Sequence, residues 1–591
     1  MSGSSPQFQA ANNAEQRNAV LALRERPHSQ VLIIGGGING VGTFRDLALQ
    51  GVDVVLVERG DYCQGASGAS SHMIHGGIRY LENGEFRLVK ESVEERNGLL
   101  KIAPHYVKPL QTTIPIFSTV SGVLSAPLRF LTHKQQGKPK ERGAFLIKLG
   151  LSLYDSFSRD GGNVPKHEFS GRKKALQTLP KLNPGIKYAA TYFDASVYNP
   201  ERLTLDVLRD GELTGKAAAG SGKTDTARAS NYLAVTAVTE AGVELSDQLT
   251  GERFIFSADV VVNTTGAWVD ETNQAIGAAT SFMGGTKGSH IVLDHPELLA
   301  ACAGREIFFE HTDGRIVLIY PMGDRVLVGT TDLDADMRED ALCTDEEIDY
   351  FFDLVSHVFP TIPISRDQIV YSFSGVRPLP KHDATQPGFV SRDYRIEQAQ
   401  QNIAGRPTPV LSLVGGKWTT FRVLSEHMSN EVLTLLGKER KISTAKLAIG
   451  GGVDFPSTGS AVEEWIQAHI TATIDAERAS VLLTRYGTRA AQVIEFLEAG
   501  TDSVLHSTHE LSTREVAYIA EHEQVGHLVD VIIRRTSLAF RGLVSAELLA
   551  ELAQALSEPL GWDPERVQSE ISHAEQILDR FHRVQVQNLI A

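Results

Sequence analysis

One stretch decides the fold: Gln30-Val31-Leu32-Ile33-Ile34-Gly35-Gly36-Gly37-Ile38-Asn39-Gly40, in which a short apolar run passes directly into a glycine-rich turn. A helix-compatible segment, 41–50, follows, and a second apolar run, 52–57, ends at Glu58. Strand, turn, helix and strand in this order, within about 30 residues, form a βαβ unit. The sequence therefore predicts an α/β protein with a Rossmann-like dinucleotide-binding domain.

The glycines of this turn have physical tasks in binding a dinucleotide. Gly35 permits the tight turn out of the strand, Gly37 lets backbone N–H groups approach a pyrophosphate, and Gly40 allows close packing of the helix. The helix start then presents N–H groups and a positive dipole end to that pyrophosphate. Glu58, about 20 residues further on, is placed to accept hydrogen bonds from the adenosine ribose. An acidic residue rather than an arginine there favours FAD or NAD over NADP.

Length, composition and charge narrow the class of protein. The chain has 591 residues, of which 42% are hydrophobic and 22% charged, so it is long enough for two or three globular domains. These values exclude a disordered, collagen-like or polytopic membrane chain. The net charge of −15 argues against nucleic acid as a partner, because phosphate backbones are bound by basic faces. Any anionic ligand must therefore meet a local basic cluster.

Cysteine usage and the N-terminal sequence point to a cytoplasmic protein. Cys63, Cys302 and Cys343 are far apart and lack C-x-x-C spacing, so neither a disulfide framework nor a cysteine metal site is expected. Residues 1–29 lack the apolar core of a secretory signal and are interpreted as a flexible or short helical extension. The uncharged window 109–128 contains three prolines, so a membrane-spanning helix is improbable there.

Periodicity predicts alternating strands and helices up to about residue 436 and helices beyond it. A helix is expected at 202–213 and a loop at 214–230. Strands are expected at 232–238, 253–263, 315–320, 325–329 and 409–414. The segment 217–224 nearly matches a phosphate-binding P-loop, but a helix precedes it where that motif needs a buried strand. We therefore expect no nucleoside triphosphate site there.

A second motif carries a family resemblance. After Glu58 comes Ser70-Ser71-His72-Met73-Ile74-His75-Gly76-Gly77-Ile78-Arg79-Tyr80-Leu81-Glu82. Together with the opening G-G-G-I-N-G-V-G, this sequence closely resembles the FAD-dependent glycerol-3-phosphate dehydrogenases. Further matches follow in family order, among them 263–268, 287–292, 329–332, 375–379, 392–394, 415–422 and 534–536. The resemblance covers about 30–545, with His72 where the family has Lys, an expanded region at 109–142 and an inserted loop at 214–230.

The resemblance implies a three-part architecture. A Rossmann-like FAD-binding domain would be interleaved with an antiparallel-sheet substrate domain within 30–436, followed by an all-α C-terminal cap domain at 437–591. The FAD-binding parts would be about 30–108, 190–270 and 370–436. Within them, sequence-distant pieces around 31–82, 255–268 and 410–422 would build the dinucleotide domain together, with FAD bound noncovalently.

The resemblance also implies the roles of individual residues. Cofactor contacts are expected from Gly35, Gly37, Ile38, Asn39, Gly40, Glu58, Ser70, Ser71, His75, Gly76, Gly77, Gly266, Trp268, Gly416, Lys417 and Thr419. The substrate is expected to meet Arg79, Tyr80, Arg377, Arg392 and Lys417, because guanidinium and ammonium groups match a phosphate dianion. His290 is the candidate base. Arg377 can stabilise alkoxide charge or bind phosphate, and the sequence leaves this choice, and the assignment of the base, open. His72 and His75 have metal-ligand spacing but no third ligand motif, so no metal is expected.

The implied activity is oxidation of sn-glycerol 3-phosphate to dihydroxyacetone phosphate by hydride transfer to FAD, with the electrons passed to a membrane quinone. The competing interpretations are a glycerol-3-phosphate oxidase that makes hydrogen peroxide, an oxidase of amino or hydroxy acids, and a flavin-binding protein without turnover. A cluster of five basic residues lies beside apolar ones in the sequence: Arg129, Lys134, Lys138, Lys140 and Arg142. Such a cluster is typical of contact with the inner face of the membrane, but it is equally typical of a solvated loop. A homodimer is implied by the resemblance only.

Overall fold

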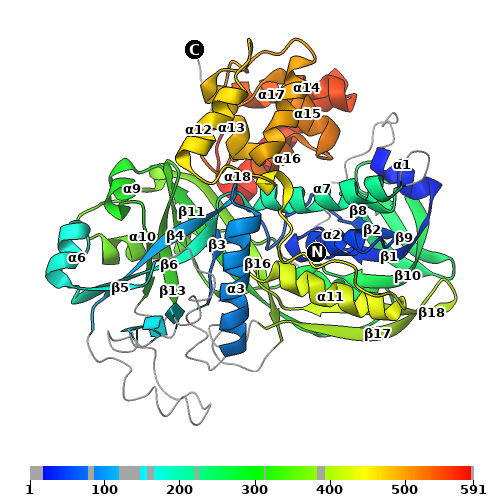
Figure 1. Cartoon of the computed structure of the whole chain (residues 1–591), viewed down its shortest axis with the longest axis horizontal. Coiled ribbons are helices and arrows are strands. Elements are labelled where there is room, and N and C mark those ends of the chain that lie inside the picture. The colour runs from blue at the N-terminus through cyan, green and yellow to red at the C-terminus, as the bar shows by residue number, and fades with distance from the viewer. Residues whose placement is uncertain are drawn as a thin grey trace, which may run out of the picture.

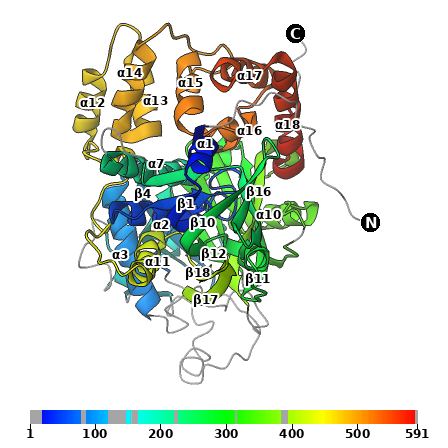
Figure 2. The same ribbon diagram turned by 90° about the vertical axis from the view of Figure 1, so that its right-hand side faces the viewer.

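The computed structural model describes residues 18–77, 86–118, 147–148, 150–152, 154–155, 165–219, 225–311, 315–337, 339–381 and 393–586. Its described part is an α/β body formed by two sheets, with a group of helices at one end (Figures 1 and 2). The first sheet, its covering helices and the second sheet lie below the C-terminal helices in both views. The fold is therefore mixed α/β with a separate helical C-terminal part.

The first sheet joins strands that are far apart in the sequence. Within the described ranges it has eight strands: β1 (His28–Ile34), β2 (Val54–Val57), β7 (Ala227–Ser230), β8 (Leu233–Thr239), β9 (Gly242–Asp247), β10 (Arg253–Asn263), β17 (Arg395–Ile403) and β18 (Arg406–Val414). Strands β18, β10, β1, β2 and β7 are adjacent in this order and all parallel. Strand β17 runs antiparallel to β18, and the β8–β9 hairpin attaches to β10. The expected joining of three distant segments is confirmed for this sheet.

Both faces of the parallel strands are covered, which explains their near-continuous apolar sequences. Helices α2 (Ile38–Leu49), α7 (Pro200–Ala219) and α11 (Phe421–Leu435) pack on one face, with Val31, Ile33 and Phe44 in that core. Leu32 and Ile34 point to the other face and pack against the β8–β9 hairpin and Leu23 of α1 (Asn18–Glu25). The alternation along β1 therefore supplies two hydrophobic cores at once.

The second sheet is mainly antiparallel. Within the described ranges it has ten strands: β3 (Met73–Ile74), β4 (Val107–Ile116), β5 (Glu168–Gly171), β6 (Tyr188–Val197), β11 (Met283–Leu293), β12 (Glu306–Glu310), β13 (Ile316–Met322), β14 (Arg325–Gly329), β15 (Leu333–Asp334) and β16 (Ile369–Pro380). Its outer face packs against α6 (Arg172–Thr178), α9 (Pro296–Cys302) and α10 (Asp345–Val358), and η3 (Arg366–Gln368) leads directly into β16. Its inner face, through Val292, Tyr371 and Phe373, meets the C-terminal helices.

Short loops and helices complete the described chain. Helix α3 (Phe86–Ile102) packs against β4 and β6 of the second sheet, and η2 (Gly266–Trp268) and α8 (Val269–Ala275) follow β10. The C-terminal part comprises η5 (Gly450–Gly452), α12 (Gly459–Ala468), α13 (Ala476–Tyr486), η6 (Gly487–Arg489), α14 (Ala490–Glu498), α15 (Thr513–His522), α16 (Leu528–Asp530), the π-helical turn η7 (Val531–Arg535), α17 (Ala546–Leu560) and α18 (Pro564–His582). Among the described residues, no helix is both long and apolar enough to cross a bilayer.

Local expectations differ from the structure in a few places. The predicted loop 214–230 is wrong at both ends, because α7 continues to Ala219 and β7 occupies Ala227–Ser230. The P-loop-like segment begins inside α7, so a helix and not a buried strand leads into it. Most of β6 and most of β16 lie within the segments expected to bind FAD, 190–270 and 370–436, yet both strands belong to the second sheet. The domain bounds themselves stay a prediction.

Candidate functional site

The glycine turn after β1 has the close contacts that a dinucleotide loop needs. Gly35 has a φ of +110°, a conformation that only glycine adopts easily. A Cβ atom on Gly40 would lie 1.9 Å from the Gly35 carbonyl oxygen, so the start of α2 packs directly on the turn. The Glu58 carboxylate accepts hydrogen bonds from the N–H groups of Gly36 at 2.7 Å and Gly60 at 2.8 Å. The turn, helix start and acidic residue are thus held together.

The residues of this loop fit FAD. Burial raises the pKa of Glu58, and the two backbone N–H groups oppose that rise. A carboxylate held in this way still has lone pairs for ribose hydroxyls. The Asn39 Oδ1 atom is buried and has no hydrogen-bond partner among the described residues, and Gly37 has no Cβ to block approach to the helix start. These are the features of a cradle that a dinucleotide completes.

The segment from Ser70 to Gly77 leads from the first sheet into the second. The Ser71 hydroxyl and His290 Nε2 share a hydrogen bond of 2.8 Å. The Ser70 hydroxyl accepts from the backbone N–H of His72 at 3.3 Å, and Gly77 has a φ of +75°. The predicted cofactor segment therefore lies against the candidate base.

Another predicted cofactor loop, 415–419, closes on the same segment. The Thr419 hydroxyl donates to the His75 carbonyl at 3.2 Å. A Cβ atom on Gly416, whose φ is +113°, would lie 3.2 Å from Asn39 Nδ2, so this loop also contacts the glycine turn. Lys417 is buried and its Nζ donates to the Ser92 hydroxyl of α3 at 2.6 Å.

The predicted cofactor residues Gly266 and Trp268 follow β10, whose end packs on the glycine turn, since a Cβ atom on Gly35 would lie 2.8 Å from the Thr264 carbonyl oxygen. Gly266 has a φ of +64° and begins η2, which ends at Trp268. The Trp268 ring lies 3.4 Å from where a Cβ atom on Gly65 would be, and the Arg59 guanidinium lies 4.7 Å above that ring. The structure thus brings four sequence-distant segments around one loop.

His290 and Arg377 share one face of the second sheet. Because side chains alternate along a strand, Gly288 and His290 of β11 point to the same side. The Arg377 guanidinium crosses from β16 over Gly288, where an added Cβ atom would lie 2.0 Å from its Nη2. Its Nη1 donates to Asp332 Oδ1 at 3.0 Å and its Nη2 to the Thr330 hydroxyl at 2.9 Å. Gly288 therefore makes room for a guanidinium beside the candidate base.

The environment of His290 keeps its ring neutral. Burial, then the charges of Arg377 and His72, lower the pKa of His290 well below its usual value. The ring stacks on Phe373 with 4.7 Å between centroids, and its Nδ1 has no hydrogen-bond partner among the described residues. A neutral imidazole has one nitrogen without a proton and can act as a base at neutral pH.

Three predicted substrate residues, Arg79, Tyr80 and Arg392, lie outside the described residues, as does the basic cluster 129–142. His72, where the resemblance leads one to expect Lys, is buried and its Nδ1 lies 3.1 Å from the Val197 carbonyl. Burial lowers the pKa of His72 to about 4. Within the described ranges, no three His, Cys, Asp or Glu side chains lie together as potential metal ligands.

Sequence reasoning missed the residues that hold these loops. Asp194 Oδ1, on β6, accepts hydrogen bonds from the Gly76 N–H at 3.0 Å, Arg96 Nη1 at 3.0 Å and the Tyr154 hydroxyl at 2.5 Å. The Ser67 hydroxyl accepts from the N–H of Ile38 at 3.0 Å. A signal existed for Asp194, because it is the only acidic residue in the apolar run 188–197.

The dinucleotide loop, the two sheets and the neutral histidine define a flavin-dependent oxidoreductase. Residues 30–396 match the FAD dependent oxidoreductase family, and the chain belongs to that family. Residues 442–567 match the C-terminal domain of alpha-glycerophosphate oxidase. FAD is therefore its cofactor.

The named relatives narrow this class. The chain is 32% identical over 589 residues to a glycerol-3-phosphate dehydrogenase of Synechocystis sp., covering 95% of this chain and 97% of the relative. It is 30% identical to a D-erythritol 1-phosphate dehydrogenase of Brucella abortus, covering 87% of this chain and 95% of that relative. The structure of a glycerol-3-phosphate dehydrogenase from Bacillus halodurans complexed with FAD has the same fold, with a TM-score of 0.72, 22% identity and coverage of 97% of this chain and 98% of that chain.

Proposed function

We propose that this flavoenzyme oxidises sn-glycerol 3-phosphate to dihydroxyacetone phosphate and passes the electrons to a membrane quinone. The observation that carries the proposal is the placement of His290 and Arg377 on one face of the second sheet, with His290 hydrogen-bonded to Ser71 of the cofactor segment. A neutral base and a cation beside a flavin segment suit an alcohol that bears an anionic group. The names of the relatives support the same substrate class.

The substrate phosphate would be bound by cations that reach the site from different loops. Arg377 has the fork geometry that matches phosphate oxygens, and Lys417 adds a compact charge from the loop before α11. Asp332 contacts Arg377 from one side, so it fixes the direction of the guanidinium. We propose Arg79, Tyr80 and Arg392 as further phosphate partners, from the resemblance of their motifs.

The alcohol would be oxidised with His290 as the base. FAD, when bound, supplies the redox chemistry. His290 accepts the proton of the C2 hydroxyl, because its lowered pKa leaves the ring neutral at pH 7. Ser71 orients the ring through Nε2, and the stacked Phe373 keeps water from one face of it. Arg377 lies near enough to stabilise negative charge on the alkoxide oxygen or to hold the phosphate.

The direct test is anaerobic reduction of the purified holoenzyme. Addition of glycerol 3-phosphate without oxygen is expected to bleach the flavin absorbance, whereas glycerol, which lacks the phosphate, is expected to leave it unchanged. D-erythritol 1-phosphate serves as the substrate comparator, because a relative is named for it. A flavin that stays oxidised with glycerol 3-phosphate would refute the proposed activity.

An oxidase that passes electrons to oxygen is the second candidate. It is favoured by the match of residues 442–567 to a domain named for alpha-glycerophosphate oxidase. Peroxide release, measured beside reduction of a soluble quinone analogue, separates the two acceptors. If the main product is one mole of peroxide for each mole of substrate, the electron acceptor is oxygen and the proposed quinone acceptor is rejected.

We further propose a location at the inner face of the cell membrane, where a quinone is accessible. The support is the cluster of five basic residues at 129–142, beside the apolar Phe130 and Leu131 in a chain of net charge −15. Replacing all five with Gln is expected to abolish sedimentation with anionic liposomes. Unchanged sedimentation would remove this cluster as the anchor. A homodimer is proposed from the resemblance, and light scattering tests it.

A further inference from the structure

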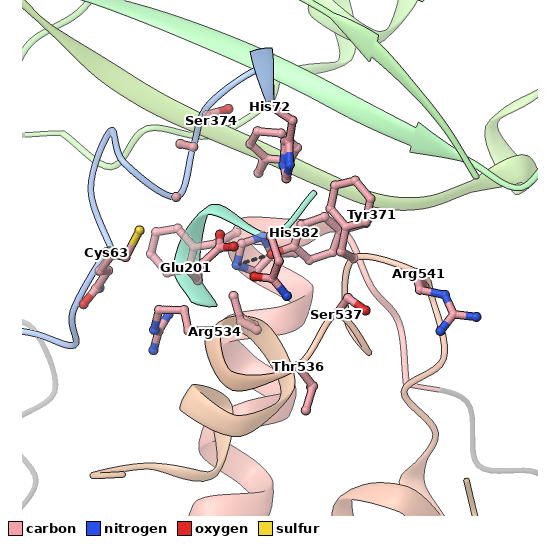
Figure 3. Close-up of a pocket in the computed structure, with 18 of the residues that line it drawn as sticks. Cys63, His72, Glu201, Tyr371, Ser374, Arg534, Thr536, Ser537, Arg541 and His582 are labelled. Atoms are coloured by element: carbon pink, nitrogen blue, oxygen red, sulfur yellow. Dashed lines mark hydrogen bonds between the residues drawn. The ribbon is translucent and has the colours of Figure 1, made fainter. Parts of the chain in front are cut away.

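A cavity of about 250 Å³ lies where the C-terminal helices meet the inner face of the second sheet (Figure 3). It is bounded by the segment 63–72, by β16, by the start of α7, and by the residues around η7 and the end of α18. None of His290, Arg377 and Lys417 lines it, so it is distinct from the candidate substrate site.

Flat rings form much of the cavity wall. Tyr371 and Phe373 come from β16, and Phe540 and Phe581 come from the C-terminal part. The rings of Phe373 and Phe540 have centroids 6.4 Å apart, and His72 lies 5.4 Å from Phe540. Such walls favour a planar apolar ligand, because ring faces and edges pack against one another in defined geometries.

A carboxyl group in the cavity wall, that of Glu201, is available to a ligand. It lies in the first turn of α7, beside Gly68, where an added Cβ atom would be 3.1 Å from Glu201 Oε1. In the described part of the chain, this carboxyl has no hydrogen bond or ion pair with another residue. Burial raises the pKa of Glu201 to about 8, so at neutral pH it is mostly protonated and can donate a hydrogen bond.

The two arginines of the wall and His582 already have partners. His582 Nδ1 donates to the Ser372 carbonyl at 2.9 Å, and burial lowers the pKa of His582 to about 4, so the ring is neutral. Arg534 donates to Asp61 and Asp530, each at 2.5 Å. Arg541 pairs with Asp324 and Glu510, and its guanidinium points away from the centre of the cavity (Figure 3). A phosphate-bearing ligand would therefore find no unneutralised cation among these residues.

From these features we propose that the cavity binds an uncharged, planar ring compound whose carbonyl oxygen accepts a hydrogen bond from Glu201. The aromatic walls supply the area for the ring, and the neutral carboxyl supplies one directional contact. Phe373 forms part of this wall and also stacks on His290, so the occupant would be separated from the candidate base by a single ring. The proposal holds whatever the substrate of the flavin site is.

The test is equilibrium dialysis of the purified holoenzyme with 2,3-dimethyl-1,4-naphthoquinone, in the absence of glycerol 3-phosphate. This probe is neutral, carries carbonyl oxygens, and has no free ring position at which the nearby Cys63 thiol would add. Saturable binding of this neutral probe is expected. The related 2-hydroxy-3-methyl-1,4-naphthoquinone is an anion at neutral pH, and we expect it to bind at least about tenfold more weakly because the wall offers it no free cation. Equal binding of the neutral and anionic probes would overturn the proposal.

Variants locate the bound probe. E201L is expected to weaken probe binding about tenfold, because the hydrogen bond from residue 201 is lost. E201Q keeps a hydrogen-bond donor, so its affinity for the probe is expected to stay within about threefold of the wild-type value. The matched control is E212L, which removes another buried carboxyl of α7 that contacts Gln524 outside the cavity. S537W fills the cavity and is expected to abolish binding. If S537W binds the probe as tightly as the wild type does, while its FAD content and circular dichroism are unchanged, the proposed site is refuted. Flavin bleaching by glycerol 3-phosphate tests the proposed function separately.

Discussion

Replacing Asp61 with Asn should loosen the C-terminal helices from the flavin-binding body. Asp61 follows β2 and is fully buried. Its Oδ2 accepts from Arg534 Nε at 2.5 Å and from Arg535, and its Oδ1 accepts from Arg535 Nη2 at 2.9 Å. Both arginines belong to η7, more than 470 residues away in the chain. This carboxylate is therefore a fully buried charged link between the two parts.

The loss in free energy of unfolding caused by D61N depends on which arginine loses its counter-charge. Arg534 keeps Asp530, whereas in the part of the chain that the structure describes Arg535 keeps the carbonyl oxygens of Glu523 and Gln524 as its close partners. Removing one member of a buried ion pair typically costs about 3–5 kcal/mol, because the remaining charge stays out of water. Since an asparagine oxygen can still accept one hydrogen bond, we expect a loss near the lower end, about 3 kcal/mol.

Urea unfolding followed by tryptophan fluorescence measures this loss. Trp268 and Trp418 lie in the flavin-binding part and Trp465 and Trp562 in the C-terminal part, so both parts contribute to the signal. The matched control is D324N, which alters another ion pair to the C-terminal part. Asp324 pairs with Arg541 but its side chain is 47% exposed, so the expected loss is below about 1 kcal/mol. A loss for D61N no larger than that for D324N would refute the reasoning.

Four further predictions follow from the site and from Asp61. H290A is expected to slow flavin reduction by about 10²- to 10⁴-fold with little change in substrate affinity, and stopped-flow absorbance that shows a normal single-turnover rate would remove His290 as the base. K417M is expected to raise KM about 10- to 100-fold while FAD stays bound, because a charged phosphate partner is lost, and steady-state kinetics with unchanged KM and kcat would remove Lys417 from the site. G40A is expected to lose FAD, because its Cβ atom would lie 1.9 Å from the Gly35 carbonyl, and full flavin content after gel filtration would contradict this. Burial raises the pKa of Asp61, but Arg535 and Arg534 together lower it by more, so the net pKa lies well below its usual value. The charged carboxylate therefore stabilises the fold above the ordinary Asp pKa of about 3.9, and this contribution is lost as the pH falls below that value. The stabilities of the wild type and of D61N, measured by acid unfolding, should consequently converge at low pH.

The local parts of the fold were predictable because their causes are local. Strand β10 coincides with the predicted range 253–263 and strand β14 with 325–329, since each is a short apolar run of β-forming residues. The end of α7 was not predictable in the same way. The small residues after Leu213 suggest a loop, but Gly215 packs closely against β7, where an added Cβ atom would lie 2.4 Å from the Ala227 N atom, and this tertiary contact carries the helix to Ala219.

In the candidate site, too, the local features were predictable from the sequence and the long-range contacts were not. Motifs identified His290, Arg377 and Lys417, but not what surrounds them. The hydrogen bond from His290 to Ser71 spans 219 residues, and that from Lys417 to Ser92 spans 325. No periodicity or spacing specifies such a pair, because each partner is an ordinary serine in its own segment. The lowered pKa of His290 likewise depends on burial, which only packing produces.

By itself, the sequence determined the βαβ unit, its glycine turn with Glu58, and the helical C-terminal part, because backbone sterics and hydrophobic periodicity act over a few residues. Only the tertiary structure decided that Asp194 holds Gly76, that Asp61 holds Arg535, and that a cavity lies between β16 and the C-terminal helices. These features arise where surfaces from distant segments meet. Their energies depend on burial and on the partner that packing supplies, and neither is encoded in any single stretch of the chain.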